Sequence, residues 1–130
     1  MLDRQIDRAI DPTAVRGIGY EPTYSGVPSL FRRPFSTTPG GADIAVLGVP
    51  LDLATTNRPG ARFGPRAVRA ASTNLSWEGA PWPWGFDPFL ALEVTDCGDC
   101  FFDPGHPTEI VPAIEGRATE LMSGGASLVS

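Results

Sequence analysis

An unbroken apolar run at residues 44–49, with the sequence IAVLGV, sets the strongest limit on the fold of this chain. Strands with one face in water alternate apolar and polar residues, whereas strands covered on both faces are apolar throughout. The run therefore predicts a buried strand of a parallel sheet, which ends before Pro50. Gly48 within it predicts that another group packs closely against the strand backbone.

A helix is predicted directly after the loop that follows this strand. Proline is suited to the first turn of a helix, so Pro65 marks the start of a helix over residues 65–72. Its apolar stripe toward the sheet is predicted to consist of Val68, Ala71 and Leu75. Arg66 and Arg69 are expected on the opposite, solvent-facing side of the helix.

A second strand is predicted over residues 90–96, where apolar and polar residues alternate. One face of this strand is predicted to consist of Leu90, Leu92 and Val94. The other face carries Glu93 and Thr95, which is typical of a sheet edge with one wetter face. Residues 96–99, with the sequence DCGD, are predicted to form the turn that ends the strand.

A second helix is predicted over residues 109–123, capped by Thr108 and ended by the glycine pair at residues 124–125. Its buried stripe is predicted to consist of Ile110, Ile114, Ala118 and Leu121. Residues 126–130 then open a third strand. The order strand–helix–strand–helix–strand predicts a parallel α/β sheet with right-handed crossovers. Because the third strand reaches its carboxyl end at the last residue, we expect residues 42–130 to be an incomplete α/β domain.

Residues 1–41 are predicted to form an irregular N-terminal arm. Glycine and proline recur so densely after Pro12 that no long regular element is expected, and only residues 3–10 are predicted to form a short helix. The arm still carries large apolar side chains, namely Tyr20, Tyr24, Leu30, Phe31 and Phe35. We therefore expect it to lie on its own domain or on a neighbouring subunit.

The charge balance argues against two classes of partner. The chain has 10 basic and 15 acidic residues, a net charge of −5, which disfavours binding to nucleic acid and to anionic membranes. No apolar run approaches the roughly 20 residues that span a bilayer, and the N-terminus has no apolar signal core. A cytoplasmic location is expected.

Cys97 and Cys100 are the only cysteines, and their C-x-x-C spacing leaves three interpretations open. A structural zinc site would need further ligands, and no second C-x-x-C or histidine pair is present. A redox dithiol would normally open a helix rather than follow a strand. Two reduced thiols in a cytosolic protein is the simplest interpretation.

All three tryptophans lie within residues 77–84. One interpretation is a surface loop that folds its aromatic side chains onto the edge of the domain. The other is a protein-contact surface, because exposed clusters of tryptophan often mark interfaces.

One local cluster has the residue types of a metal site, namely Asp96, Asp99, Asp103 and His106. No pair within it has helical or C-x-x-C…H spacing, so the cluster alone is not expected to bind a metal. The residues themselves therefore identify neither a catalytic side chain nor a metal ligand.

The sequence GVPLD at residues 48–52, followed by TTNRPGARFGPRAVR at residues 55–69, closely resembles the agmatinase branch of the arginase/agmatinase-type ureohydrolases. YSGVPSLFRRP at residues 24–34 is similar to the N-terminal arm of that family, and VTDCGD at residues 94–99 is similar to its second strand. The glycine pair and strand at residues 124–129 resemble the lead-in to its first metal motif. Only the N-terminal portion of the family is represented.

This resemblance implies a three-layer α/β/α fold with a mainly parallel sheet, assembled as a homo-oligomer, a trimer or hexamer. It implies hydrolysis of a small guanidino compound, agmatine or similar, to urea and an amine by a pair of Mn²⁺ ions. The GGDHS-like, DAHxD and DxDxxDP motifs that hold those ions in the family do not occur in these residues. We therefore expect this chain alone to bind no metal pair and to be inactive.

A contribution to the rim of the substrate pocket is expected instead, from Asn57, Arg58 and Gly60. Their loop leaves the carboxyl end of the first strand, where ligands bind in α/β sheets, and glycine allows a close backbone approach. The alternative is that Arg58 and Arg62 pair with acidic groups and only fix the loop. For the chain as a whole, the alternative function is a non-catalytic ureohydrolase-like subunit or interaction module.

Overall fold

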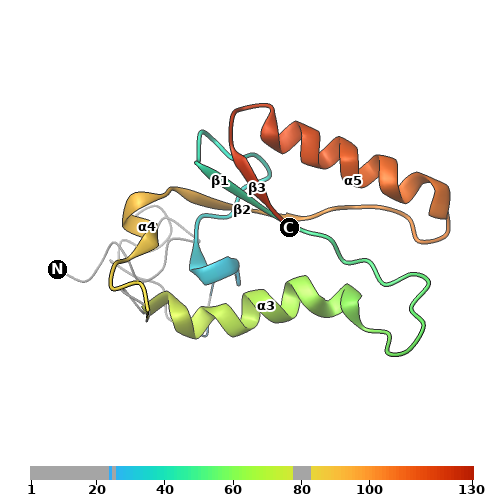
Figure 1. Ribbon diagram of the computed structural model, residues 1–130, viewed down its shortest axis with the longest axis horizontal. Helices are drawn as coiled ribbons and strands as arrows, with labels where there is room; N and C mark the ends of the chain where they lie inside the picture. The colour runs from blue at the N-terminus through green and yellow to red at the C-terminus, as the bar shows by residue number, and fades with distance from the viewer. Residues whose placement is uncertain (1–23, 25, 78–82) are drawn as a thin grey trace.

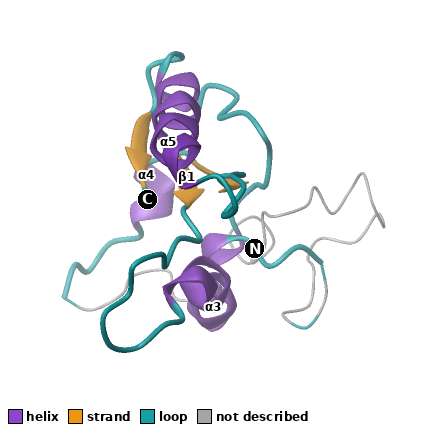
Figure 2. Cartoon of the chain, turned by 90° about the vertical axis from the view of Figure 1, so that its right-hand side faces the viewer, coloured by secondary structure: helices purple, strands orange, loops and turns teal. Residues whose placement is uncertain are grey.

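The computed structural model describes Tyr24, residues 26–77 and residues 83–130, and it contains one three-stranded parallel sheet in the order β2-β1-β3. The strands are β1 (Ile44–Gly48), β2 (Val94–Asp99) and β3 (Ser127–Val129). Helix α3 (Gly64–Ser72) lies between β1 and β2 in the sequence, and α5 (Pro107–Met122) lies between β2 and β3. The two helices lie on opposite faces of the sheet (Figures 1 and 2), which confirms the three-layer α/β/α arrangement.

The face of the sheet toward α5 holds the main hydrophobic core. Ala45 and Leu47 of β1 point to this side and pack with Cys97, Leu121 and Ala126. The predicted stripe of α5 is confirmed, because Ile110 and Leu121 are buried and Ile114 and Ala118 are partly buried. These contacts exclude water from the apolar side chains of β1, which is the main driving force for packing a helix on a sheet.

The start of α5 differs from the prediction. The helix begins at Pro107 with His106 at its N-cap position, so Thr108 lies within the first turn rather than capping it. Proline is favoured at this first position because its missing N–H would have no partner in the helix anyway. At the other end, Gly125 adopts a φ of 92°, as expected for a glycine that ends a helix.

The predicted orientation of α3 is wrong. Val68 and Leu75, which the pattern placed against the sheet, are 57% and 51% exposed. Arg69, which was expected to face solvent, is buried against the sheet together with Ser72. The physical reason lies on β2, where two carboxylates meet the Arg69 guanidinium, so the buried charge is paired.

Strand β2 begins four residues later than predicted, and the turn expected at residues 96–99 is part of the strand. Residues Pro88–Ala91 form the short helix α4 instead, and Leu90 within it is 61% exposed. The Asp87 side chain accepts a hydrogen bond from the Phe89 amide at 2.9 Å, and Pro88 occupies the first helical position. An N-cap aspartate followed by proline is a helix-start signal, and here it outweighs the alternating pattern.

The described part of the arm lies on its own domain. It contains only the short 3₁₀ turn η1 (Leu30–Arg32), and Phe35 then pairs with Asp96 in a parallel bridge along the outer edge of β2. Tyr24 and Phe35 are exposed, while Leu30 and Phe31 are partly buried. The predicted helix over residues 3–10 and Tyr20 lie outside the described residues, and the boundary at residue 41 stays a prediction.

The face of the sheet toward α3 is only partly covered by the described residues. An apolar groove of about 570 Å³ lies there, and its sheet side is formed by Ile44, Val46, Val94 and Val129. None of the helices in the described part of the chain has the length and apolar character that a membrane span requires.

Candidate functional site at the carboxyl edge of the sheet

The loop between β1 and α3 leaves the carboxyl edge of the sheet, the edge at which ligands bind in parallel α/β folds. It is closed at its base by Asp52, whose side chain is 2% exposed. One carboxylate oxygen, Oδ2, accepts a hydrogen bond from the Gly60 amide at 2.8 Å. The other, Oδ1, accepts a hydrogen bond from Arg62 Nε at 2.6 Å and forms an ion pair with Arg62 Nη2 at 2.5 Å. We call this set of contacts the clasp.

The clasp also determines the protonation of Asp52. The side-chain hydrogen bond from Arg62 lowers the pKa of the Asp52 carboxyl, and the Gly60 amide adds to this against the opposing effect of burial. The same contact raises the pKa of the Arg62 guanidinium. Both groups are therefore charged at neutral pH.

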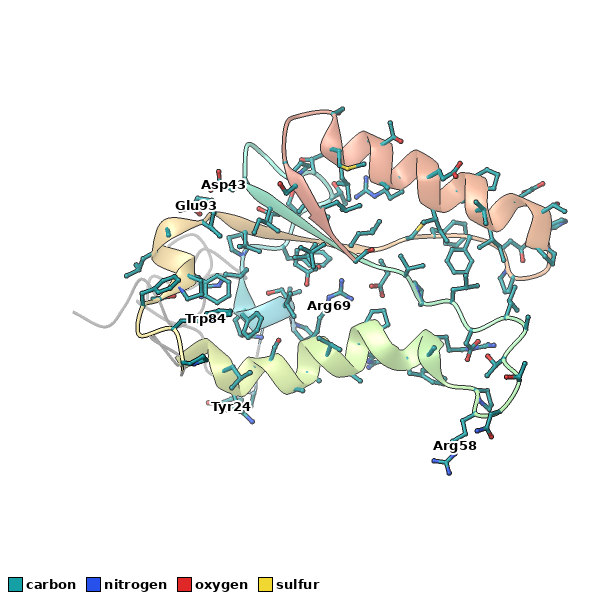
Figure 3. The ribbon with its side chains drawn as sticks, viewed as in Figure 1. Tyr24, Asp43, Arg58, Arg69, Trp84 and Glu93 are labelled. Carbon is teal, nitrogen blue, oxygen red and sulfur yellow. The ribbon has the colours of Figure 1, made fainter. Side chains whose placement is uncertain are left out.

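The structure places the three predicted rim residues differently from one another. Gly60 belongs to the clasp and adopts a φ of 135°, a backbone conformation that favours glycine. Asn57 and Arg58 are exposed, and Arg58 points away from the sheet (Figure 3). Of the two arginines in the alternative interpretation, Arg62 is paired with Asp52, whereas no ion pair of Arg58 exists among the described residues. The rim role of Asn57, Arg58 and Gly60 stays a prediction.

A small cleft of about 220 Å³ lies beside the clasp. One wall comes from the loop after β1, with the Asp52–Arg62 pair as its charged part, and the other wall comes from the segment after β2. The lining residues are Pro50, Leu51, Asp52, Leu53, Arg62, Cys100, Phe101, Phe102 and Pro104. The cleft therefore joins the carboxyl ends of two neighbouring strands.

A second ionic cluster lies on the α3 side of the same edge, centred on Arg69 (Figure 3). Its Nε and Nη2 donate to the two oxygens of Asp96 at 2.7 and 2.9 Å, and its Nη1 donates to Asp99 Oδ1 at 2.5 Å. The hydrogen bond with Asp96 raises the pKa of the Arg69 guanidinium, against the opposing effect of burial. Asp96 is completely buried and also accepts hydrogen bonds from the Leu30 and Gly98 amides. The cluster therefore connects α3, β2 and the arm.

Sequence reasoning missed this cluster, because a nine-residue helix with a plausible apolar stripe gave no reason to bury an arginine. The available signal was the pair of aspartates in the DCGD stretch, which lies at the end of a buried strand. The close approach predicted at Gly48 is confirmed: a Cβ atom there would overlap the Asp99 carboxylate and lie 2.8 Å from Pro65 Cβ.

The acidic residues near His106 do not form a metal site. Asp96 and Asp99 bind Arg69, while Asp103 Oδ2 pairs with His106 Nδ1 at 3.0 Å on the surface. Among the described residues, no three His, Cys, Asp or Glu side chains converge where a metal ion could be held. These residues therefore do not supply the ligands of a dinuclear centre.

The two cysteines are free thiols within the core, beside Leu47 and Leu121. Burial raises the pKa of the Cys97 and Cys100 thiols above the ordinary value, only partly offset by the charge of Arg117. Reactive and metal-binding cysteines have a lowered pKa. The arrangement therefore agrees with the simplest interpretation, two reduced thiols.

The tryptophan-rich segment is described only in part, since Trp82 lies outside the described residues. Trp84 is 60% exposed and stacks on Phe86, with 6.2 Å between ring centroids. Whether this segment is a folded surface loop or a protein-contact surface stays a prediction.

Comparison with known proteins gives a family match and several similar relatives. Residues 42–130 match the model of the arginase family. The agmatinase of Chromobacterium violaceum is 48% identical over 132 aligned residues, which include all of this chain and 41% of the relative. The agmatinase of Edwardsiella ictaluri is 42% identical over 83% of this chain and 37% of its own length. The chain thus spans about two fifths of the length of these relatives.

Solved structures agree with the sequence matches. The crystal structure of a hypothetical agmatinase from Burkholderia thailandensis superposes with a TM-score of 0.76 at 52% identity, covering 82% of this chain and 34% of that one. Proclavaminate amidino hydrolase from Streptomyces clavuligerus superposes with a TM-score of 0.70 at 31% identity, covering 79% of this chain and 34% of that one.

Proposed function

Since this chain belongs to the arginase family, we propose that it supplies the N-terminal part of an agmatinase-type ureohydrolase. The complete protein hydrolyses a small guanidino compound, agmatine or similar, to urea and an amine. The observation that carries the proposal is the 48% identity to an agmatinase along the whole chain. A non-catalytic subunit has no comparable support, because the relatives named above are agmatinases.

Membership of the arginase family indicates a metal-dependent enzyme, and we propose a manganese pair as the metal centre. A bound metal pair would supply a hydroxide at neutral pH by acidifying a bridging water. The described residues lack a set of ligands for a metal pair. We therefore place the ligands of the metal centre in a part of the complete protein that corresponds to the unmatched part of the relatives. We therefore expect no hydrolysis by residues 1–130 alone.

The loop after β1 is proposed to form part of the pocket rim. It leaves the ligand-binding edge of the sheet, and the clasp fixes its base beside a cleft. Asn57, Arg58 and Gly60 lie on this loop, and Gly60 is held by Asp52. Because Arg58 points away from the sheet, its partner would be a neighbouring subunit or a segment outside the described residues.

Homo-oligomeric assembly, as a trimer or hexamer, and a cytoplasmic location complete the proposal. Large apolar side chains at the surface support subunit contacts, notably Val68, Leu75 and Trp84, each at least half exposed. The net charge of −5 supports the absence of nucleic acid and anionic membrane among the partners.

A chimera tests the proposed function. The segment of the Chromobacterium violaceum agmatinase that matches this chain would be replaced by residues 1–130, and urea release from agmatine would be measured with Mn²⁺ present. We expect urea formation well above a metal-only blank, and none from residues 1–130 alone. A folded chimera that hydrolyses neither agmatine nor other guanidino compounds would contradict the proposal.

A further inference from the structure

The loop between Asp52 and Gly60, residues 53–59, is a closed surface loop whose two ends are joined by one carboxylate; we call it the rim loop. Asp52 at its start holds the Gly60 amide and the Arg62 guanidinium at its end. All of residues 53–59 are exposed, whereas the Asp52 side chain is almost completely buried. The rim loop therefore depends on its base, rather than on a core of its own, for a fixed shape.

The backbone of this loop also needs an external tie. Ala54 adopts a φ of 58° and Gly60 a φ of 135°. A left-handed alanine is unfavourable and persists only when its surroundings enforce it. The Thr55 hydroxyl donates to the Asp52 carbonyl at 2.6 Å, which adds a second contact at the same end. Asp52 thus anchors the loop through both its side chain and its main chain.

We propose that Asp52 is a positioning residue of the substrate site, which acts through Gly60 and Arg62 to hold the rim loop in one conformation. The inference rests on the proposed function, because it concerns the same carboxyl edge of the sheet. Asp52 itself does not contact the substrate. Its carboxylate is already occupied by three donors, so a guanidinium group of the substrate would have to displace Arg62.

The position of the clasp explains why this matters for binding. The Asp52–Arg62 pair forms the charged part of a cleft whose other wall follows β2, including Cys100 and Phe102. If the rim loop samples several conformations, the wall of the cleft that the substrate binds is formed in only a fraction of the molecules. The apparent affinity then falls in proportion to the competent fraction, while the chemical step after binding is unaffected.

Two substitutions separate this role from general stability. Asp52→Asn retains the acceptor for the Gly60 amide but removes the charge that binds Arg62. Asp43→Asn is the matched control, since Asp43 is an exposed aspartate next to the opposite end of β1. Its side chain accepts a hydrogen bond from the Glu93 amide at 2.9 Å. In the active chimera we expect Asp52→Asn to raise KM about three- to tenfold with kcat within about twofold. Asp43→Asn should change neither constant.

The isolated chain tests, without any measurement of activity, whether Asp52 holds the rim loop in one conformation. We expect Asp52→Ala to accelerate amide hydrogen exchange about tenfold or more at Gly60, whose amide donates to Asp52, while β1 and α5 remain protected. Equal exchange in the parent chain and Asp52→Ala would overturn the inference whatever the chimera does. Faster exchange with an unchanged KM in an active chimera would also overturn it, because the loop would then be ordered for another purpose. A folded but inactive unmodified chimera would instead refute the proposed function.

Discussion

Arg69 of α3 binds Asp96 of β2 through two parallel hydrogen bonds, from Nε to Oδ2 and from Nη2 to Oδ1, in the interior of the domain. This is the paired geometry in which arginine binds a carboxylate most strongly. Asp96 also accepts a hydrogen bond from the Leu30 amide of the arm, and the Phe31 amide donates to Ser72 Oγ of α3 at 2.8 Å. The ion pair thus fixes α3 to the sheet, and the two amide hydrogen bonds attach the arm to both.

Replacement of Arg69 should therefore be severely destabilising. Arg69→Ala leaves the Asp96 carboxylate buried without its cation, and breaking a buried pair in this way typically costs about 3–5 kcal/mol. Arg66→Ala on the exposed side of the same helix is the control and should change the free energy of unfolding by less than about 0.5 kcal/mol. Urea denaturation followed by circular dichroism measures both. Similar midpoints for the two variants would show that the pair contributes little.

Two glycines should respond to alanine in opposite directions. At Gly48 a Cβ atom would overlap the Asp99 carboxylate and crowd Pro65, so Gly48→Ala should destabilise the chain by about 1–3 kcal/mol. Gly116 lies within α5 with no atom within 4 Å of an added Cβ. Gly116→Ala should stabilise it by about 0.5–1 kcal/mol, because alanine favours the helix. Thermal unfolding of both variants gives the comparison, and a neutral Gly48→Ala would refute the close contact.

The sequence predicts the elements of this fold better than their orientation. The apolar run of β1 and the stripe of α5 identify the core correctly, since burial of apolar side chains decides both. Pattern reasoning failed where a polar interaction outweighs hydrophobic burial. Arg69 faces the sheet because of two carboxylates that are distant in sequence. The Asp87 cap starts α4, which takes up the first two residues of the predicted strand over residues 90–96.

In the candidate site too, the sequence predicts the position of the loop but not its polar contacts. The loop after β1 was located from the order of elements alone. Gly60 was expected to allow a close backbone approach to a ligand, whereas the structure shows that its φ of 135° is what favours glycine there. Asp52 was missed, because a lone aspartate after a strand does not reveal a partner ten residues later. The direction of Arg58 depends on the three-dimensional course of the loop, which residue types do not specify.

The core thiols predict how stability changes at alkaline pH. Burial raises the pKa of Cys97 and Cys100 in the folded chain, so the folded state retains protons that the unfolded state releases. Their contribution is complete below the ordinary thiol pKa of about 8.5 and is lost as pH rises through the higher folded value. We expect the urea midpoint to fall between pH 8 and pH 10. In the Cys97→Ala/Cys100→Ala variant the urea midpoint should fall less over this pH range. An identical fall in the variant would show that other titrating groups cause it.

The shift of the Asp52 pKa has the opposite sign and leads to a prediction at acid pH. Its folded pKa is lowered, chiefly by the hydrogen bond from Arg62, so the clasp is intact above the ordinary carboxyl pKa of about 3.9 and opens only as pH falls through the lower folded value. The Gly60 amide, which donates to Asp52, reports this opening directly. Its NMR chemical shift should titrate with a midpoint below 3.9 in the parent chain, over the range in which α5 amides show that the chain is still folded. In Asp52→Asn this titration should vanish. A midpoint at or above the ordinary value would mean that Arg62 does not hold the carboxylate in solution, and the loop would then lack the anchor on which its fixed shape depends.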